Sequence, residues 1–535
     1  MARRLSLRTE SKPPGRMVRD EAGIAMIVVM AVVMILTFTT LALFTQAVQQ
    51  LPLARHDQDH ETALAAAEAG VDDYLNHLNQ NSNYWAYNAA NTPPDGNQAF
   101  TTWVPVPGPL NNNESFRYTP DTSKTGISGT IYLTSSGMSR NVIRTVKVGI
   151  RRQGFLDFLY MTDYEIVDPA LSGDPGNCVF HAWEANAASP TGYGPNPSTC
   201  SIVYWTDSAA LTGPVHTNDG LYVCGSPQFH GDTDTYYNSP ASQSVAGSTN
   251  FVGPGLVLNP KGCTNTPVFD RLHDPASGAD LKFPPANLAI RTQADGSVGG
   301  QGCLYTGPTT IVLHNSGNVG QMDVTSPGTK STNAGCGPGT NLALPANGVV
   351  YVQTIPSSSS DPNHSSCTGS ACNGDASISG TLAGQLTIAS QNDIIIKDNL
   401  LYHQYPSGTD VLGLIAFNNV ALYHPVNSSG VNQAGSLTDP TVDAAILALN
   451  HSFFVQNWTK GAPLGSLTVN GVITQEFRGA VGTFQGTPPV ITTGYNKNYT
   501  YDTRLKYLSP PYFLSPTQSA WQRISYAEIQ PTATP

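Results

Sequence analysis

The chain has 535 residues, of which 12% are charged, 50 are glycine and 40 are proline, and its formal net charge is -11. This length allows roughly two to four domains, although an all-β domain can exceed about 200 residues as one unit. The composition favours short strands joined by turns, as in secreted proteins, over a helical cytosolic enzyme. We do not expect the protein to bind nucleic acid, because the sequence beyond the N-terminus has no basic patch that could neutralise phosphates.

Residues 1–23 are expected to form a cytoplasmic basic leader. They contain six Lys or Arg residues and three acidic residues. An excess of positive charge before an apolar run places that end of the chain in the cytoplasm. The bulk of the chain is therefore expected outside the cytoplasm, at the cell surface.

An apolar run follows, and residues 24–44 read IAMIVVMAVVMILTFTTLALF. At about 1.5 Å per residue, a helix of this length crosses the roughly 30 Å hydrocarbon core of a bilayer. We therefore predict a transmembrane helix over 24–45, in contact with membrane lipid. A secretory signal peptide is the competing interpretation, but its apolar core is about 7–15 residues long and ends at small residues.

Residues 46–79 are expected to extend this helix beyond the membrane, with a kink at Pro52. From 54 to 79 helix-forming residues continue without proline. Apolar residues recur there at three- and four-residue spacing, which predicts one apolar stripe along the helix. The stripe consists of Leu64, Ala67, Val71, Tyr74, Leu75 and Leu78.

The junction between leader and helix has a recognisable pattern. Glu21-Ala22-Gly23 stands directly before Ile24 and the apolar run, and residues 65–70 read AAAEAG. This arrangement resembles the N-terminus of type IV pilins and pseudopilins, specifically of the PilX-type pilus assembly proteins. The resemblance implies that a prepilin peptidase cuts after Gly23 and that the new N-terminus at Ile24 is methylated.

One position departs from that pattern. Major pilins usually carry Glu as the fifth residue of the mature chain, and here this position is Val28. The departure resembles the minor subunits of such filaments, and an uncut signal anchor is the alternative. The positions expected to carry membrane insertion and assembly with other pilin or pseudopilin subunits are Val28, Leu36, Leu64, Val71 and Leu78.

Residues 80–153 are expected to form a small β-rich, pilin-like module. Strand-like runs occur at 100–106, 115–120, 129–137 and 141–151. The last of them alternates apolar and polar residues, which indicates a half-buried antiparallel strand. A helix packed on a small antiparallel sheet is the expected arrangement.

Residues 154–505 are expected to form a parallel β-solenoid with loop insertions at 232–300 and 354–376. Short apolar strands recur, most densely from 378 to 480, with Gly, Asn or Asp between them. Such coils bury their inner faces by stacking on each other. A β-sandwich is the alternative, because the repeat is not strict in length.

The strings at 213–219, 386–402, 411–425 and 494–505 also resemble the C-terminal region of PilX-like surface proteins of actinobacteria. That resemblance implies a surface protein and no particular chemistry. The remaining residues, 506–535, are expected to form a C-terminal cap over the last coil and a tail, because open solenoid ends invite edge pairing.

All eight cysteines follow the apolar run, and no two have Cys-x-x-Cys spacing. An even number beyond a membrane segment favours disulfides over a zinc site, although buried free thiols are the alternative. We expect sequential pairing, because each neighbouring pair then closes one local loop. The cysteines are Cys178, Cys200, Cys224, Cys263, Cys303, Cys336, Cys367 and Cys372.

Candidate catalytic groups are few. His216, with Asn218 and Asp219 nearby, suits metal binding or proton relay, but a turn before a strand explains the same residues. Glu476 and Arg478 stand two apart on a predicted strand, which favours an ion pair with a neighbouring coil over catalysis. The acids of the solenoid lie mainly at strand starts and corners, not as repeated pairs on one face. They include Asp375, Asp393, Asp410, Asp439 and Asp443.

The function expected from the sequence is a non-enzymatic, membrane-anchored minor pilin or pilus assembly protein that displays a β-solenoid head. No catalytic residue, metal or cofactor is expected. Its expected partners are membrane lipid, pilin or pseudopilin subunits, a prepilin peptidase, and a carbohydrate or other cell-surface ligand. A membrane-anchored β-helix adhesin or polysaccharide-active enzyme is the alternative, and it requires a carboxylate cluster in a groove of the solenoid.

Overall fold

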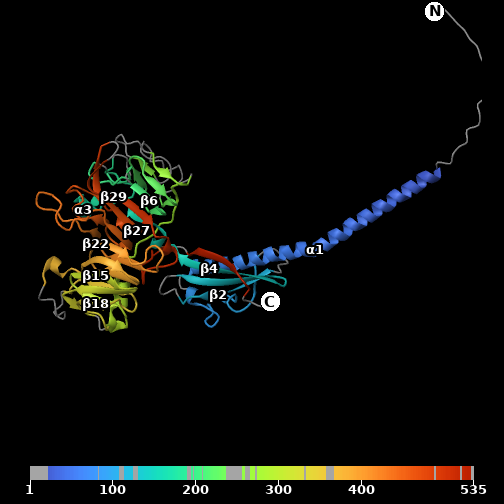
Figure 1. Cartoon of the computed structure of the whole chain (residues 1–535), viewed down its shortest axis with the longest axis horizontal. Coiled ribbons are helices and arrows are strands. Elements are labelled where there is room, and N and C mark those ends of the chain that lie inside the picture. The colour runs from blue at the N-terminus through green and yellow to red at the C-terminus, as the bar shows by residue number, and fades with distance from the viewer. Residues whose placement is uncertain are drawn as a thin grey trace, which may run out of the picture.

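The computed structural model describes residues 22–531 except for 82–83, 108–113, 124–129, 190–193, 197, 208, 237–255, 259–265, 272–273, 331–332, 357–366, 487–489 and 518–520, with the backbone alone at 22–24, 47–54 and 256–258. Most of the expected leader (1–21) and Cys263 lie outside the described residues. The chain is mainly β, with one long N-terminal helix, a small antiparallel sheet and a large mixed sheet (Figure 1).

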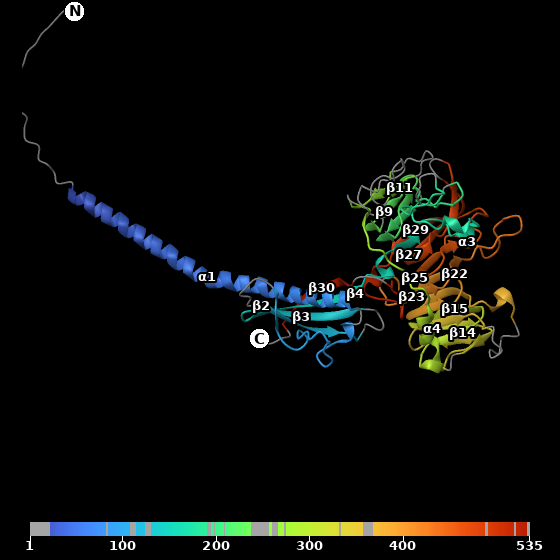
Figure 2. The ribbon, with the colours of Figure 1, turned by 180° about the vertical axis from the view of Figure 1, so that it is seen from behind.

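Helix α1 (Ala22–Gln80) is continuous for 59 residues and is not interrupted at Pro52. Its apolar N-terminal part projects away from both sheets, whereas its C-terminal part lies along the small sheet (Figures 1 and 2). In the projecting part, Thr37, Thr39 and Thr40 donate hydroxyl hydrogen bonds to carbonyls one turn earlier. These hydroxyls are thereby satisfied within the helix, which suits them to an apolar environment.

The small sheet has the strand order β1-β2-β3-β4-β30 and is antiparallel throughout. Its strands are β1 (Val104–Pro105), β2 (Glu114–Asp121), β3 (Ile131–Ser139), β4 (Val142–Arg152) and β30 (Trp521–Ile529). The end of α1 packs on this sheet around a core that includes Tyr74, Phe116 and Val148. The expected module of a helix on a small antiparallel sheet is therefore present.

Strand β30 corrects one expectation, the cap at 506–535. Trp521–Ile529 pairs with β4 in the small sheet instead of covering the large one. The physical reason is that β4 would otherwise present an unpaired edge, which a strand from the end of the chain completes. Only the stretch before it lies against the large sheet, where the Thr387 hydroxyl donates to the carbonyl of Pro511.

Within the described residues, the large sheet contains 23 strands, and a separate parallel pair is formed by β8 (Leu221–Val223) and β11 (Leu256–Leu258). The strands of the large sheet are β5 (Tyr160–Tyr164), β6 (Ala209–Thr212), β7 (Val215–Thr217), β9 (Gln228–His230), β10 (Thr233–Thr235), β12 (Val268–Phe269), β13 (Ala276–Ser277), β14 (Cys303–Thr306), β15 (Thr309–Ser316), β16 (Val319–Thr325), β17 (Gly328–Thr329), β18 (Gly339–Ala343), β19 (Val349–Gln353), β20 (Ala376–Leu382), β21 (Gln385–Ser390), β22 (Ile394–Tyr402), β23 (Val411–Ala416), β24 (Val420–Leu422), β25 (Thr441–Ala448), β26 (Phe453–Val455), β27 (Pro463–Phe477), β28 (Gly482–Gln485) and β29 (Val490–Tyr501). The short helices beside it are α3 (Pro169–Ser172) and α4 (Leu288–Ala294).

Most pairings in the large sheet are parallel. One ladder runs β14-β19-β21-β23-β25-β27 and continues through β5, β7, β10 and β13. A second runs β15-β20-β22-β24-β26, and a third runs from β27 through β29, β6, β9 and β12. Antiparallel pairs occur at β15–β16 and β28–β29. This pattern differs from a β-sandwich, which packs two antiparallel sheets.

Strand β27 joins two distant parts of the chain. Its first part, from Pro463 to Gly471, pairs with β29, and its last part, from Ile473 to Phe477, pairs with β5. The first ladder therefore passes from β27, near the end of the chain, to β5, near its beginning. Strands from residues 160–277 extend the ladder that strands from residues 303–477 form. Figure 2 shows this order, with β9 at one end of the large sheet and β14 and β15 at the other.

Three of the expected disulfides form, Cys178–Cys200, Cys303–Cys336 and Cys367–Cys372. Their sequence separations are 22, 33 and 5 residues, so each closes a local loop, as sequential pairing predicts. Cys224 is also disulfide-bonded, and its expected partner Cys263 lies outside the described residues. Among the described cysteines none is a free thiol.

Candidate functional site

The apolar half of α1 is the first candidate site. The span Ala25–Gln46 is long and apolar enough to cross a membrane, and all of it is exposed. Val28 and Leu36 are 55% and 57% exposed. A contiguous apolar surface of this size marks a membrane or partner interface, and a membrane anchor and a signal sequence both fit it. Gly23 and Ile24 lie in the first turn of α1, where the structure describes only the backbone.

The C-terminal half of α1 has the opposite character, because it is packed. Val71 and Leu78 are buried, and Leu64 is half-buried against the same core. The Ser135 hydroxyl donates to the carbonyl of Ala67 at 2.8 Å, which fixes the helix on β3. One continuous helix therefore connects an exposed apolar segment to a packed segment on the small sheet.

His216 and Asp219 do not form an open catalytic pair. Both side chains are fully buried. His216 Nδ1 contacts the carboxylate of Asp234, and its Nε2 lies 3.1 Å from Asn218 Oδ1. Asn218 Nδ2 in turn donates to Asp163 Oδ1 at 3.0 Å. This chain of hydrogen bonds ties β7 to β10 and to the end of β5, and His216 lies fully buried within it.

Asp219 instead accepts backbone hydrogen bonds. The amides of Glu165, Ala182 and Gly220 donate to its carboxylate at 3.0, 2.6 and 2.7 Å. Burial raises the pKa of Asp219 to about 6, while His181 and these amides oppose the rise. The side chain therefore holds three loops together, and the described residues contain no cluster of His, Cys, Asp and Glu that suits a metal ion.

The acids at strand corners act as caps. Asp443 accepts the amide of Tyr402 at 2.9 Å, and Asp410 accepts the amide of Gly384 at 2.6 Å. Asp439 accepts the amide of Ser466 at 2.7 Å. Each bond satisfies a backbone donor, at the end of β22 for Tyr402, between β20 and β21 for Gly384 and at an irregularity near the start of β27 for Ser466. These acids are thereby used for structure, as their corner positions predict.

His181 gives the fold a pH dependence. Burial lowers its pKa, but the hydrogen bonding to Asp163 and Glu184 and the charges of Asp219 and Asp163 prevail and raise it to about 9. A histidine whose pKa is raised on folding contributes stability that is complete below about pH 6.5 and is lost as the pH passes about 9, at about 1.4 kcal/mol per pKa unit. We expect His181→Gln to flatten the fall in unfolding midpoint between pH 6.5 and 9. Thermal unfolding at both pH values measures this, and an unchanged slope would contradict it.

A buried ion pair lies at the joint made by β27. Arg478, the residue after β27, has a fully buried side chain, and so has Glu165, the residue after β5. Arg478 Nη1 donates to Glu165 Oε2 at 2.9 Å and to the carbonyl of Val203 at 3.2 Å. Its guanidinium lies 3.6 Å from the ring centroid of Trp205, whose Nε1 also donates to Glu165 at 3.0 Å. The predicted ion pair between Arg478 and a neighbouring strand is thus present, with Glu165 as the partner.

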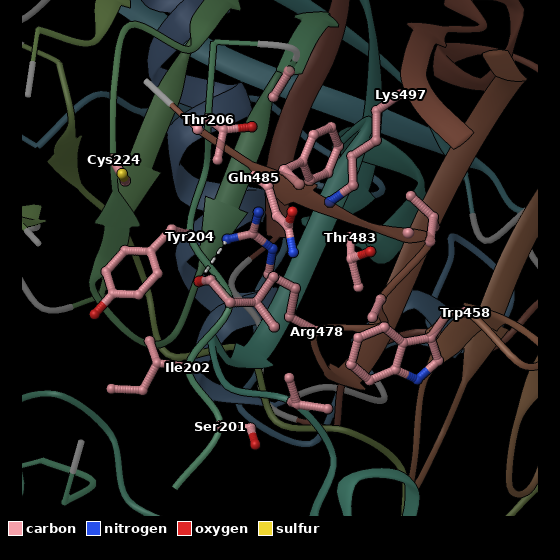
Figure 3. A pocket seen from close by; sticks show the side chains of 18 residues that line it. Ser201, Ile202, Tyr204, Thr206, Cys224, Trp458, Arg478, Thr483, Gln485 and Lys497 are labelled. Carbon is pink, nitrogen blue, oxygen red and sulfur yellow. Dashed lines mark hydrogen bonds between the residues drawn. The ribbon is translucent and has the colours of Figure 1, made fainter. Parts of the chain in front are cut away.

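Arg478 also lines a pocket of about 390 Å³, which lies between the segment 201–206, β28 and β29. Figure 3 shows its guanidinium at the centre of the lining side chains, with Lys497, Gln485 and Thr483 around it. Among the described residues, Nε and Nη2 of Arg478 have no hydrogen-bond partner. An unsatisfied buried donor costs about 1–3 kcal/mol, and more when it is charged.

Lys497 brings a second cation to this pocket. Its ammonium lies 4.8 Å from the ring centroid of Trp205. Burial lowers the pKa of Lys497 well below its ordinary value, and the charge of Arg478 lowers it further, while Glu165 opposes this. This shift favours the neutral amine of Lys497, and Arg478 and Glu165 balance each other in charge, so an anion bound beside them would favour the protonated form of Lys497.

This pocket is a candidate site that sequence reasoning missed. Arg478 was interpretable only as one half of an ion pair, and Glu165 and Lys497 carry no motif. Glu165 and Arg478 are 313 residues apart and meet only because β5 pairs with β27. Arg478, a single basic residue directly after an apolar strand, is the sequence feature that could have indicated this pocket.

Comparisons with known proteins add little. No protein-family model matches the chain, and no curated protein matches it at a significant level. Among solved structures, the crystal structure of the competence-associated pilin ComZ from Thermus thermophilus is similar at 13% sequence identity and a TM-score of 0.30. The match covers 88% of this chain and 97% of that one.

Proposed function

We propose that this chain is a membrane-anchored, non-enzymatic accessory subunit of a type IV pilus-like system, of the PilX-type minor class. The observation that carries the proposal is the division of α1. Its residues Ala25–Gln46 form an exposed apolar rod, and the same unbroken helix is packed from Ala63 to Leu78 on a small antiparallel sheet. This apolar segment can move from lipid into a bundle of similar helices, and the domain attached to the end of α1 does not need to refold when it does so.

The large domain is proposed to be a β-solenoid head displayed at the cell surface. Its parallel ladders support this, because each strand lies directly on a strand of the next layer. The proposed organisation is a leader at 1–23, a membrane helix at 24–45, its extension at 46–79, a pilin-like module at 80–153 completed by β30, and a head at 154–505. Membrane lipid, other pilin subunits and a prepilin peptidase are the proposed partners.

A polysaccharide-active enzyme is the weaker proposal. His216 and Asp219, the candidates for that chemistry, are fully buried and bound to other protein groups. The corner acids cap backbone amides and do not gather in a groove. A ligand-binding head is favoured over a catalytic one.

Processing of the leader tests the proposal. Mass spectrometry of the full chain extracted from membranes is expected to find Ile24 as a methylated N-terminus. Gly23→Val is expected to leave the leader attached, because a branched side chain obstructs the scissile bond, while Gly15→Val in the same leader is processed normally. An intact 1–23 leader on the wild-type membrane protein would contradict the proposal and favour an uncut signal anchor.

A further inference from the structure

The pocket at Arg478 has hydrogen-bonding capacity that the protein does not use. The two unpartnered donors, Nε and Nη2, belong to the same edge of one guanidinium, and the side chain is fully buried. The opposite nitrogen, Nη1, is already bound to Glu165 and to a backbone carbonyl. The ion pair therefore fixes Arg478 in place and leaves its side-on edge for another acceptor.

The geometry of that edge selects a class of acceptor. Adjacent, parallel N–H groups match the two oxygens of a carboxylate, and Arg is the side chain that makes such bidentate contacts. Lys497, which lines the same pocket, adds a point charge. A carboxylate bound there would accept hydrogen bonds from the two unpartnered donors of Arg478 and would favour the protonated form of Lys497, which burial disfavours.

The residues that line the pocket suit a sugar ring, which has apolar faces and hydroxyl groups. Trp458, Tyr204 and Phe484 contribute aromatic surface, and Ser201 and Thr483 contribute hydroxyls. Figure 3 shows Trp458 and Tyr204 on opposite sides of the guanidinium. The exposed residues Gln485 and Gly486 lie at its rim. An apolar cavity of a few hundred Å³ with a few convergent polar groups is the usual form of a small-molecule site.

We propose that this pocket binds a carboxylated sugar, of the hexuronic acid class, with its carboxylate on Arg478 and Lys497 and its ring between Trp458 and Tyr204. The site lies where β5 and β27 bring the two parts of the head together. The proposal does not depend on how α1 assembles, so a processed but non-binding chain and a binding but unprocessed chain are distinguishable results.

Isothermal titration of the full chain in detergent with sodium glucuronate tests this. The wild type is expected to bind glucuronate at least about tenfold more tightly than glucose and than inorganic phosphate, a difference of about 1.4 kcal/mol. Lys497→Met is expected to weaken glucuronate binding by about tenfold or more, because it removes the charge and keeps the apolar stem. Lys460→Met, which removes an exposed charge outside the pocket, is expected to bind as the wild type does.

Three results would overturn the proposal. The first is no detectable heat with glucuronate at millimolar concentration in a wild-type chain that unfolds cooperatively. The second is equal affinity for glucose or for phosphate, which would assign the pocket to a neutral sugar or to any small anion. The third is full affinity in Lys497→Met with an unchanged unfolding midpoint, which would place the ligand elsewhere.

Discussion

Replacing Glu165 by Gln is expected to lower the free energy of unfolding of the large-sheet region by about 3–5 kcal/mol, the usual cost of breaking a buried ion pair from one side. The substitution keeps the shape of the side chain but leaves Arg478 without its counter-charge in a fully buried position. Trp205 also loses a charged acceptor. Denaturant unfolding of the full chain in detergent, followed by tryptophan fluorescence, measures the loss.

The same exchange at the surface is the matched control. Glu528→Gln removes an exposed partner of Arg144, and it is expected to leave the unfolding curve unchanged within error. The double variant Glu165→Gln with Arg478→Met is expected to recover most of the loss, because no unpaired buried charge remains. If Glu165→Gln unfolds like Glu528→Gln, the ion pair at the joint is not desolvated and does not hold the two parts of the head together.

Gly137→Ala is expected to separate α1 from the small sheet and to cost about 3 kcal/mol, the upper part of the range for overpacking. A Cβ atom at Gly137 would lie 2.1 Å from the carbonyl oxygen of Ala63 and 2.1 Å from the amide nitrogen of Ala67. Both atoms belong to the backbone of α1, so no side-chain rotation relieves the clash. Hydrogen exchange of the β2, β3 and β4 amides is expected to accelerate together with the fall in unfolding midpoint.

Gly176→Ala is the control for this prediction. Nothing lies within 4 Å of a Cβ atom there, and its backbone is not in the left-handed region. The variant is expected to match the wild type in both measurements. Equal behaviour of the two variants would show that α1 is held more loosely than the contact of Gly137 with its backbone implies.

Helix α1 was predictable, because the sequence patterns that specify it extend over only a few helical turns. The length of the apolar run indicates a membrane-length helix, and the three- and four-residue spacing selects the face of α1 that packs. Val71 and Leu78 are buried as that spacing requires, whereas Val28 and Leu36 remain exposed. The helix continues through Pro52, where a kink was expected, since the residues on either side are good helix formers.

The pairing of the cysteines was predictable for a related reason. Three pairs, Cys178–Cys200, Cys303–Cys336 and Cys367–Cys372, join neighbours in the sequence. Closing a short loop costs less chain entropy than closing a long one, so neighbouring pairs are the simplest solution for a domain made of short strands. Neighbouring cysteines can therefore be paired without knowledge of the tertiary fold.

By itself, the sequence determined that the protein has one membrane-length apolar helix with an amphipathic extension, a mainly β body and local disulfides. All of these depend on composition or on spacing along a few turns or strands. The tertiary structure alone decided that β30 completes the small sheet and that β5 is placed on β27. It also decided that Arg478, paired with Glu165, lines one pocket with Lys497. The physical reason is that strand pairing satisfies backbone hydrogen bonds identically for many partners, so the choice of partner depends on packing between residues hundreds of positions apart.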